Sequence, residues 1–566
     1  MIRLLPASLL LTCAMSFAHP ISPAEPPQVI VISDPSPEVL QQLGSRFGHV
    51  LYDHEAQEVR VEATGKDLTW ITAQNPGWRV DAEATRALQL SLSPLESLRA
   101  IPGFGCYRTV EETADTVANL VSVHPTLATS IDIGPTWRRV QNSTQGYRLQ
   151  VLKLTNSLIG GDKPKMFVMS SVHAREYTPA ELITRYAEEL LAGYGTDANA
   201  TWLLDHMEFH FLLQANPDGR KRAESGLSWR KNENSTLCSG NSAGIDLNRN
   251  FPVFWNHPNS GSSTQACSET YRGISAASEP ETQAVIGYVQ SIFPDTRTGD
   301  PQSETTPAAE NTKGLFLDVH SYSKLVLWPW GHKATRSGNA TALETLGMRL
   351  AWFNDYEPQQ AIGLYATRGT TDDFAYGELG VPAYTIELGV AFFENCTTFE
   401  NNTAPINLAA LRYAARTLHA PYKLPAGPDA RDAGIDPVSV VQGEPVTLSA
   451  TIDDSRYRNP QQSSSVTLQP RTRHVIEGAR YFVDALPWED GAIGIEMVPA
   501  DGVFDSSVEG VEAVIDTSTL APGRHLVYIQ GKDVAGEIGP PTAAFLDVAP
   551  GPDIFSDGLE DVSSGM

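Results

Sequence analysis

The spacing of apolar and polar residues divides the chain into three successive parts. Between residues 28 and 81 it predicts four strands and two helices in the order strand, helix, strand, strand, helix, strand. The strands are 28–33, 49–52, 59–63 and 78–80, and the helices are 37–47 and 66–72. This order is typical of a small antiparallel α+β sandwich of the ferredoxin-like kind. A polar linker follows, from about residue 81 to residue 103.

The second part runs from residue 104 to about residue 422, and there longer helical patterns alternate with apolar runs. The apolar runs show no polar alternation, which indicates strands buried on both faces. The predicted strands are 149–154, 166–170, 207–213, 315–319 and 383–388, and the helices are 110–123, 180–191, 281–292, 342–353 and 406–418. We therefore expect an α/β domain at 104–424, with a mixed β-sheet flanked by helices.

The helical signal ends at about residue 425. About seven short alternating runs follow, separated by turns rich in Gly, Pro and Asp. They predict an all-β sandwich of immunoglobulin type over residues 425–550. Residues 551–566 are acidic, and we expect them to be disordered.

Composition and the first residues narrow the classes of function. The chain of 566 residues has a formal net charge of −26, so it offers no basic face for nucleic acid. Residues 1–18 combine Arg3, an apolar stretch too short to span a membrane, and small residues up to Ala18. This pattern predicts a secretory signal peptide and a protein exported to the periplasm or outside the cell. In an exported chain, the even number of remaining cysteines favours disulfides: Cys106, Cys238, Cys267 and Cys396.

The candidate chemistry begins at His173 and Glu176, which directly follow the apolar run 166–170. A catalytic zinc ion takes three protein ligands and keeps a fourth position open, so this pair requires a third ligand from elsewhere. His320 follows the apolar run 315–319 and can supply it. Glu387 lies within a further apolar run, where a charge is costly unless it is functional or paired.

These residues resemble the zinc metallocarboxypeptidase family, the funnelin group of the carboxypeptidase A/B and carboxypeptidase T lineage. The resemblance covers residues 104–422 in matching order. Its motifs are His173-Ala-Arg-Glu176, Asn216-Pro-Asp-Gly219, Trp229-Arg-Lys231, Gly244-Ile-Asp-Leu-Asn-Arg-Asn250, His320-Ser-Tyr-Ser323, Tyr365 and Glu387. It implies the fold of that family and one Zn²⁺ ion per catalytic domain.

The resemblance also implies catalytic roles. The zinc ligands would be His173, Glu176 and His320, and Asp246 would orient the first histidine. Glu387 would act as the general base. Arg230 would stabilise the negative charge that develops on the scissile carbonyl oxygen.

Other matching residues would bind the substrate. Asn248 and Arg249 would hold its terminal carboxylate, as a guanidinium group can do in bidentate fashion. Tyr365 would close over the substrate, and Arg175 would lie on the path by which the carboxylate arrives. Asp372 falls at the base of the family's specificity pocket, which favours release of C-terminal Lys or Arg. Two observations bear on this preference. Arg368 lies on the same segment and could pair with Asp372. Relatives of the carboxypeptidase T kind accept both basic and aromatic or aliphatic C-terminal residues.

Two further features follow from the resemblance. The family's vertebrate branch has a disulfide at places matching Cys238 and Cys267, and Cys106 and Cys396 then remain as a second pair. Residues 19–103 resemble the family's pro-segment in size, position and topology, although a permanent accessory domain is the alternative. An activating protease would cut the linker, where Arg86 and Arg99 offer sites.

We therefore predict a monomeric, exported zinc carboxypeptidase that acts on the C-termini of peptides and proteins. Another zinc amidohydrolase on the same fold, either a deacylase of the aspartoacylase type or a peptidase that trims peptidoglycan, is one alternative. A catalytically inactive binding protein is the other, but it would require a lost ligand or base. Asn-x-Ser/Thr sites such as Asn142, Asn234, Asn339, Asn395 and Asn401 leave glycosylation open.

Overall fold

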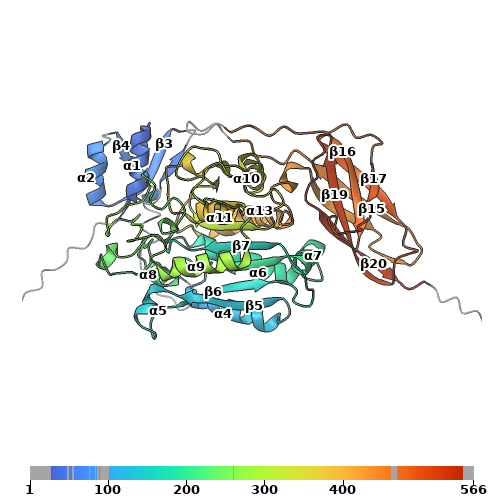
Figure 1. The fold of residues 1–566 in the computed structure, drawn as a ribbon, viewed down its shortest axis with the longest axis horizontal. Helices are drawn as coiled ribbons and strands as arrows, with labels where there is room; N and C mark the ends of the chain where they lie inside the picture. Colours follow the sequence, from blue (N-terminus) through green and yellow to red (C-terminus); the bar gives the residue numbers. More distant parts are fainter. Residues whose placement is uncertain are drawn as a thin grey trace, which may run out of the picture.

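The computed structural model describes residues 27–47, 50–53, 56–74, 77–82, 84–85, 88, 101–258, 261–460 and 468–551. The predicted signal peptide, Arg86, Arg99 and nearly all of the acidic tail lie outside these residues. The described chain forms three units along its longest axis (Figure 1). A small α/β unit lies at one end (blue), a large α/β body at the centre, and an all-β unit at the other end (red).

The small unit has the element order β1, α1, β2, β3, α2, β4 and one antiparallel sheet with the strand order β2-β3-β1-β4. Its elements are β1 (Gln28–Ser33), α1 (Pro37–Phe47), β2 (Leu51–Asp53), β3 (Glu58–Ala63), α2 (Gly65–Gln74) and β4 (Trp78–Val80). Side chains alternate across a strand, so β3 buries Val59 and Val61 in the core of the unit and turns Glu62 to the other face.

The central body contains an eight-stranded mixed sheet with the strand order β11-β10-β12-β9-β7-β8-β6-β5. The strands are β5 (Ala128–Pro135), β6 (Arg148–Leu154), β7 (Lys165–Ser170), β8 (Glu208–Leu212), β9 (Leu315–Ser321), β10 (Leu325–Trp328), β11 (Glu357–Gln360) and β12 (Ala383–Leu388). The helices around it are α4 (Val110–Val123), α5 (Trp137–Gln141), α6 (Thr178–Gly193), α7 (Ala198–His206), α8 (Pro217–Glu224), α9 (Pro280–Ile292), α10 (Ala340–Asn354), α11 (Thr371–Leu379), α12 (Cys396–Thr398) and α13 (Ala404–Arg416). The predicted mixed sheet flanked by helices is confirmed.

Parallel pairing in the middle of this sheet positions the site. β7, β9 and β12 run parallel, so their carboxyl ends meet at one edge. In the register of the pairing, Glu387 on β12 lies beside His320 on β9. The segment that leaves β7 carries His173 and Glu176, and it begins at Ser171, whose left-handed conformation (φ 55°) turns the chain sharply at the edge.

The C-terminal unit is all β, but its strands are not arranged as the predicted two-sheet immunoglobulin-type sandwich. One continuous sheet has the strand order β13-β15-β18-β17-β16-β19-β20-β14, because β17 pairs with both β16 and β18. β13 also packs along β20, so the sheet is nearly closed. The strands are β13 (Asp429–Asp436), β14 (Ser439–Val441), β15 (Val446–Asp453), β16 (Ile476–Val483), β17 (Ile495–Pro499), β18 (Val508–Ile515), β19 (Gly523–Asp533) and β20 (Thr542–Ala549).

Buried contacts join the C-terminal unit to the central body. The fully buried Arg349 of α10 forms an ion pair with Asp454 at 3.1 Å and stacks 3.5 Å above the ring of Tyr457. Both expected disulfides are present, Cys106–Cys396 and Cys238–Cys267. Across the described ranges, no helix combines the length and apolar character that a bilayer crossing requires.

Candidate active site

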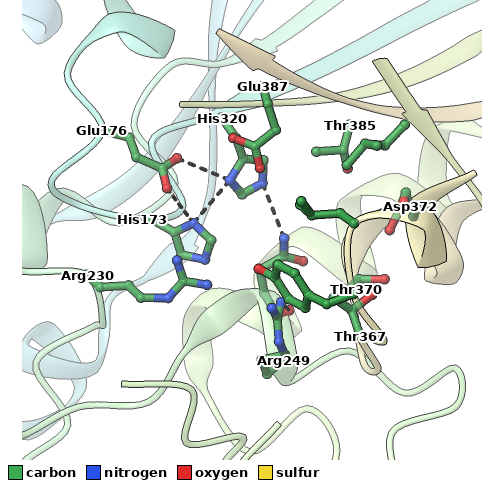
Figure 2. A pocket seen from close by; sticks show the side chains of 15 residues that line it. His173, Glu176, Arg230, Arg249, His320, Thr367, Thr370, Asp372, Thr385 and Glu387 are labelled. Carbon is green, nitrogen blue, oxygen red and sulfur yellow. Dashed lines mark hydrogen bonds and ion pairs between the residues drawn. The ribbon is translucent and has the colours of Figure 1, made fainter. Parts of the chain in front are cut away.

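Three predicted ligands converge at the carboxyl edge of the central sheet (Figure 2). The Nδ1 atoms of His173 and His320 lie 3.1 Å apart. Glu176 places Oε1 2.7 Å from Nδ1 of His173, and Oε2 3.1 Å from Nδ1 of His320. All three side chains are buried. Two nitrogens and a carboxylate therefore face a single point.

A carboxylate holds the far nitrogen of each histidine. Nε2 of His173 lies 3.1 Å from Oδ1 of Asp246, and Nε2 of His320 lies 2.9 Å from Oδ2 of Asp318. Such contacts place the ring proton on Nε2 and leave a lone pair on Nδ1. Lone pairs facing one another across 3.1 Å repel unless a cation lies between them. This donor set, His₂Glu with supporting carboxylates, fits a catalytic zinc ion.

The charges around the centre lead to the same conclusion. Burial alone would lower the pKa of His320, but Asp318 and Glu176 raise it well above its ordinary value. Burial alone would raise the pKa of Glu176, yet His173 and His320 lower it. The site therefore stabilises positive charge among buried anions, as a metal site must.

Glu387 lies beside the three converging ligands but is not one of them. Its position on β12, in register with His320, directs the carboxylate to the same face of the sheet. Burial, followed by repulsion from Glu176, raises the pKa of Glu387 to about 7, although His320 partly offsets this. Its buried Oε2 has no hydrogen-bond partner among the described residues. A carboxylate of this kind can take up and give back a proton near neutral pH.

One pocket joins these groups to most of the predicted substrate-binding residues (Figure 2). It is lined by His173, Glu176, Arg230, Asn248, Arg249, His320, Leu327, Ala361, Leu364, Tyr365, Thr367, Thr370, Asp372, Thr385 and Glu387. The predicted residues Asp246 and Arg175 do not line it. Asp246 lies behind His173 and accepts hydrogen bonds from Arg230 at 3.0 and 2.9 Å. It therefore orients both a ligand and the predicted oxyanion-binding arginine.

The candidate carboxylate-binding residues are held firmly. Nε of Arg249 donates to the carbonyl of Gly261 at 2.8 Å, and Nη1 donates to the carbonyl of Asn248 at 2.7 Å. The side-chain oxygen of Asn248 accepts the backbone N–H of Thr371 at 3.0 Å, and the side-chain nitrogen lies 3.2 Å from Nε2 of His320. These contacts fix the floor of the pocket relative to the ligands.

Asp372 is buried in the pocket wall at the start of α11. Burial, followed by repulsion from Asp373, raises its pKa to about 7. The guanidinium of Arg368 instead donates to the hydroxyl and the carbonyl of Ser262 and to the carbonyl of His257. The possible Arg368–Asp372 pair therefore does not form in this structure.

The predicted site omitted Asp318 and Thr371. Asp318 is fully buried, and besides His320 it accepts a hydrogen bond from the Thr371 hydroxyl at 2.5 Å. The sequence does indicate a role for Asp318, because it is a charged residue inside an apolar run and stands two positions before a ligand. Residues so spaced on a strand share one face.

Comparison with known proteins finds similarity to zinc carboxypeptidases. The sequence profile described as zinc carboxypeptidase matches residues 114–399. Carboxypeptidase A2 of Mus musculus is 30% identical over 249 residues, which are 44% of this chain and 52% of that protein. Zinc carboxypeptidase A 1 of Anopheles gambiae is 27% identical over 369 residues, or 62% of this chain and 74% of that protein. The chain thus spans about half the length of the mouse relative.

A solved structure shows the likeness of fold. Carboxypeptidase A from Helicoverpa armigera superposes with a TM-score of 0.56 at 22% identity, over 71% of this chain and 99% of that chain. The profile match extends over half of the chain and includes all three converging ligands and Glu387. The chain therefore belongs to the zinc carboxypeptidase family.

Proposed function

We propose that the protein is an exported zinc carboxypeptidase that hydrolyses the C-terminal peptide bond of peptides and proteins. The observation that carries the proposal is the pocket itself. It combines the His173, Glu176 and His320 donor set with Glu387 on one side and Arg249 on another. A metal-binding group, a proton acceptor and a cation for a carboxylate are what an exopeptidase requires.

Each residue of the site has a separate role in this reaction. When bound, zinc supplies Lewis-acid chemistry at the scissile carbonyl. Glu387 accepts a proton from the attacking water and delivers it to the departing amine. Arg230, oriented by Asp246, donates hydrogen bonds to the carbonyl oxygen as that atom gains negative charge. Arg249 and Asn248 bind the terminal carboxylate, and Tyr365 covers the bound residue.

We also propose a preference for C-terminal Lys or Arg. Asp372 is a buried carboxylate in the pocket wall, and the described contacts give it no cationic partner. Such a group is costly to bury unless a cation pairs with it, and a basic substrate side chain supplies that cation. The contacts of Arg368 with Ser262 and His257 remove one competitor for this role.

The small N-terminal unit would act as an inhibitory pro-segment. A Cβ atom added at Gly44 of α1 would lie 2.6 Å from the ring of Tyr365, so this helix presses on a pocket-lining residue. The neighbouring Ser45 carbonyl accepts the Thr270 hydroxyl at 2.6 Å. Glu62 lies near Arg175, which partly offsets the rise of the Glu62 pKa to about 7 that burial causes. Cleavage of the linker would release these contacts.

Release of amino acids from synthetic peptides tests the proposal. Peptides ending in Lys, Arg, Phe or Leu, each with a free or an amidated C-terminus, are incubated with the protein before and after limited proteolysis. We expect release from free C-termini only, in greater amount after cleavage, and loss of release upon chelation. Equal hydrolysis of amidated peptides would refute the exopeptidase assignment.

A further inference from the structure

We propose that the protein has a second site for a divalent transition-metal ion, formed by His257, Glu304 and His332. One ligand atom of each residue lies within 4.8 Å of the others. Three segments far apart in the sequence contribute these side chains, and none of them belongs to the catalytic pocket. Two imidazoles and one carboxylate make up the same donor set as at the first centre.

His332 is held in place as a ligand needs to be. Its side chain is buried, and its ring stacks on Phe254 with the centroids 3.6 Å apart. Nε2 lies 3.5 Å from Oε1 of Glu304. On the other side of the ring, Nδ1 lies 3.8 Å from Oδ2 of the buried Asp373. A histidine with a metal on one nitrogen and a carboxylate near the other repeats the arrangement of His173 with Asp246.

The other two residues lie close to His332. The ring centroids of His257 and His332 are 4.7 Å apart.

The three ligand atoms would have to move slightly closer together to bind an ion. Ligand atoms about 2.1 Å from a tetrahedral zinc ion lie about 3.4 Å from one another, closer than the 4.8 Å within which the three ligand atoms lie here. The side chain of Glu304 is 24% exposed and can move inward. Its present cationic partner is Lys333, whose Nζ lies 3.2 and 3.1 Å from the two carboxylate oxygens. Lys333 therefore competes with a metal ion, and its removal should strengthen binding.

The site lies behind one wall of the catalytic pocket. The carbonyl of His257 accepts a hydrogen bond from Arg368, and Asp373, next to His332, accepts the backbone N–H of Gly331 at 3.0 Å. Gly331 in turn accepts the backbone N–H of the pocket-lining Thr367 at 2.8 Å. An ion bound here would hold the segment that carries Asp372 from behind. We therefore expect occupancy of the site to raise the Tm of the central body.

Equilibrium dialysis of the full chain against zinc, followed by mass-spectrometric metal analysis, tests the proposal. We expect two ions per chain for the wild type. Loss of a residue that only supports a ligand lowers metal affinity by about 10–100-fold. Glu304→Gln removes a ligand itself, so it should lower the affinity for the second ion by about 100-fold or more. Lys333→Met should bind the second ion more tightly, and His124→Gln, outside the cluster, should match the wild type.

A variant of the first centre separates this proposal from the proposed function. His320→Ala should lose the catalytic ion and keep the second one, whatever the substrate of the enzyme is. Conversely, Glu304→Gln should lose the second ion, and its zinc-dependent rise in Tm, while keeping the first. The proposal is overturned if the wild type binds a single ion, or if Glu304→Gln and Lys333→Met bind zinc as the wild type does.

Discussion

The substitution Asp318→Asn tests how strongly this carboxylate controls zinc binding. Asp318 is fully buried, with Oδ2 2.9 Å from Nε2 of His320 and 2.5 Å from the hydroxyl of Thr371. Asparagine keeps the shape and one acceptor oxygen but loses the charge. The ring of His320 would then be less basic and less firmly oriented toward the ion.

The expected magnitude follows from these contacts. A hydrogen bond to a charged group contributes about 1.5–3 kcal/mol, and a neutral one about 0.5–1.5 kcal/mol. The difference of about 1–1.5 kcal/mol corresponds to roughly a fivefold to tenfold loss in affinity. Poorer orientation of the ring adds to this, so we expect zinc to bind about 10–100-fold more weakly.

Competition with a chromophoric chelator measures the zinc affinity of each variant. Thr371→Val is the matched control, because it removes the other hydrogen bond to the same carboxylate and keeps the charge. It should change the affinity by less than about threefold. The reasoning is refuted if Asp318→Asn binds zinc like the wild type, or if Thr371→Val loses as much affinity.

Three other predictions test the remaining parts of the site. Glu387→Gln should keep zinc and lower kcat by about 10²–10⁴, and near-normal turnover would exclude Glu387 as the base. Burial raises the pKa of Asp372 to about 7, so its carboxyl group is uncharged below that pH. The ratio of kcat/KM for C-terminal Lys to that for Phe should therefore rise as the pH rises through 7. A ratio that does not change with pH, or that Asp372→Asn leaves unchanged, would contradict the role of Asp372 in substrate selection. Gly44→Leu should push α1 away from Tyr365 and raise the activity of the uncut protein toward that of the cut form, whereas Gln42→Leu on the exposed face of α1 should not. Equal activity of cut and uncut wild type would remove the inhibitory role of this unit.

The sequence predicted the parts of the fold that depend on local pattern. β7, β9 and β12 are mostly apolar runs, and the ligand or base near the end of each was predicted with them. β10 and β11 have only four residues each, too few to show a period. α11 was missed because it begins with Thr371, Asp372 and Asp373 and is buried on nearly every side, so it lacks an amphipathic pattern.

Features that depend on distant contacts were not predictable in the same way. The strands of the C-terminal unit were visible as alternating runs, but pairing of β17 with both β16 and β18 is a matter of long-range register. Likewise, no spacing rule links His257, Glu304 and His332, which only the folded chain brings together. Asp318 belonged to a predicted strand, yet its role depends on the tautomer that His320 needs.

Zinc titration of the cleaved, metal-free protein tests the central claim most directly, with release of a C-terminal amino acid as the readout. His173, Glu176 and His320 converge on one point beside Glu387, so activity should rise from zero and, in the Glu304→Gln variant that lacks the second site, reach its plateau at one ion per chain. His320→Ala should remain at the baseline throughout the titration. Activity of the metal-free protein, or equal activation of His320→Ala, would contradict the account.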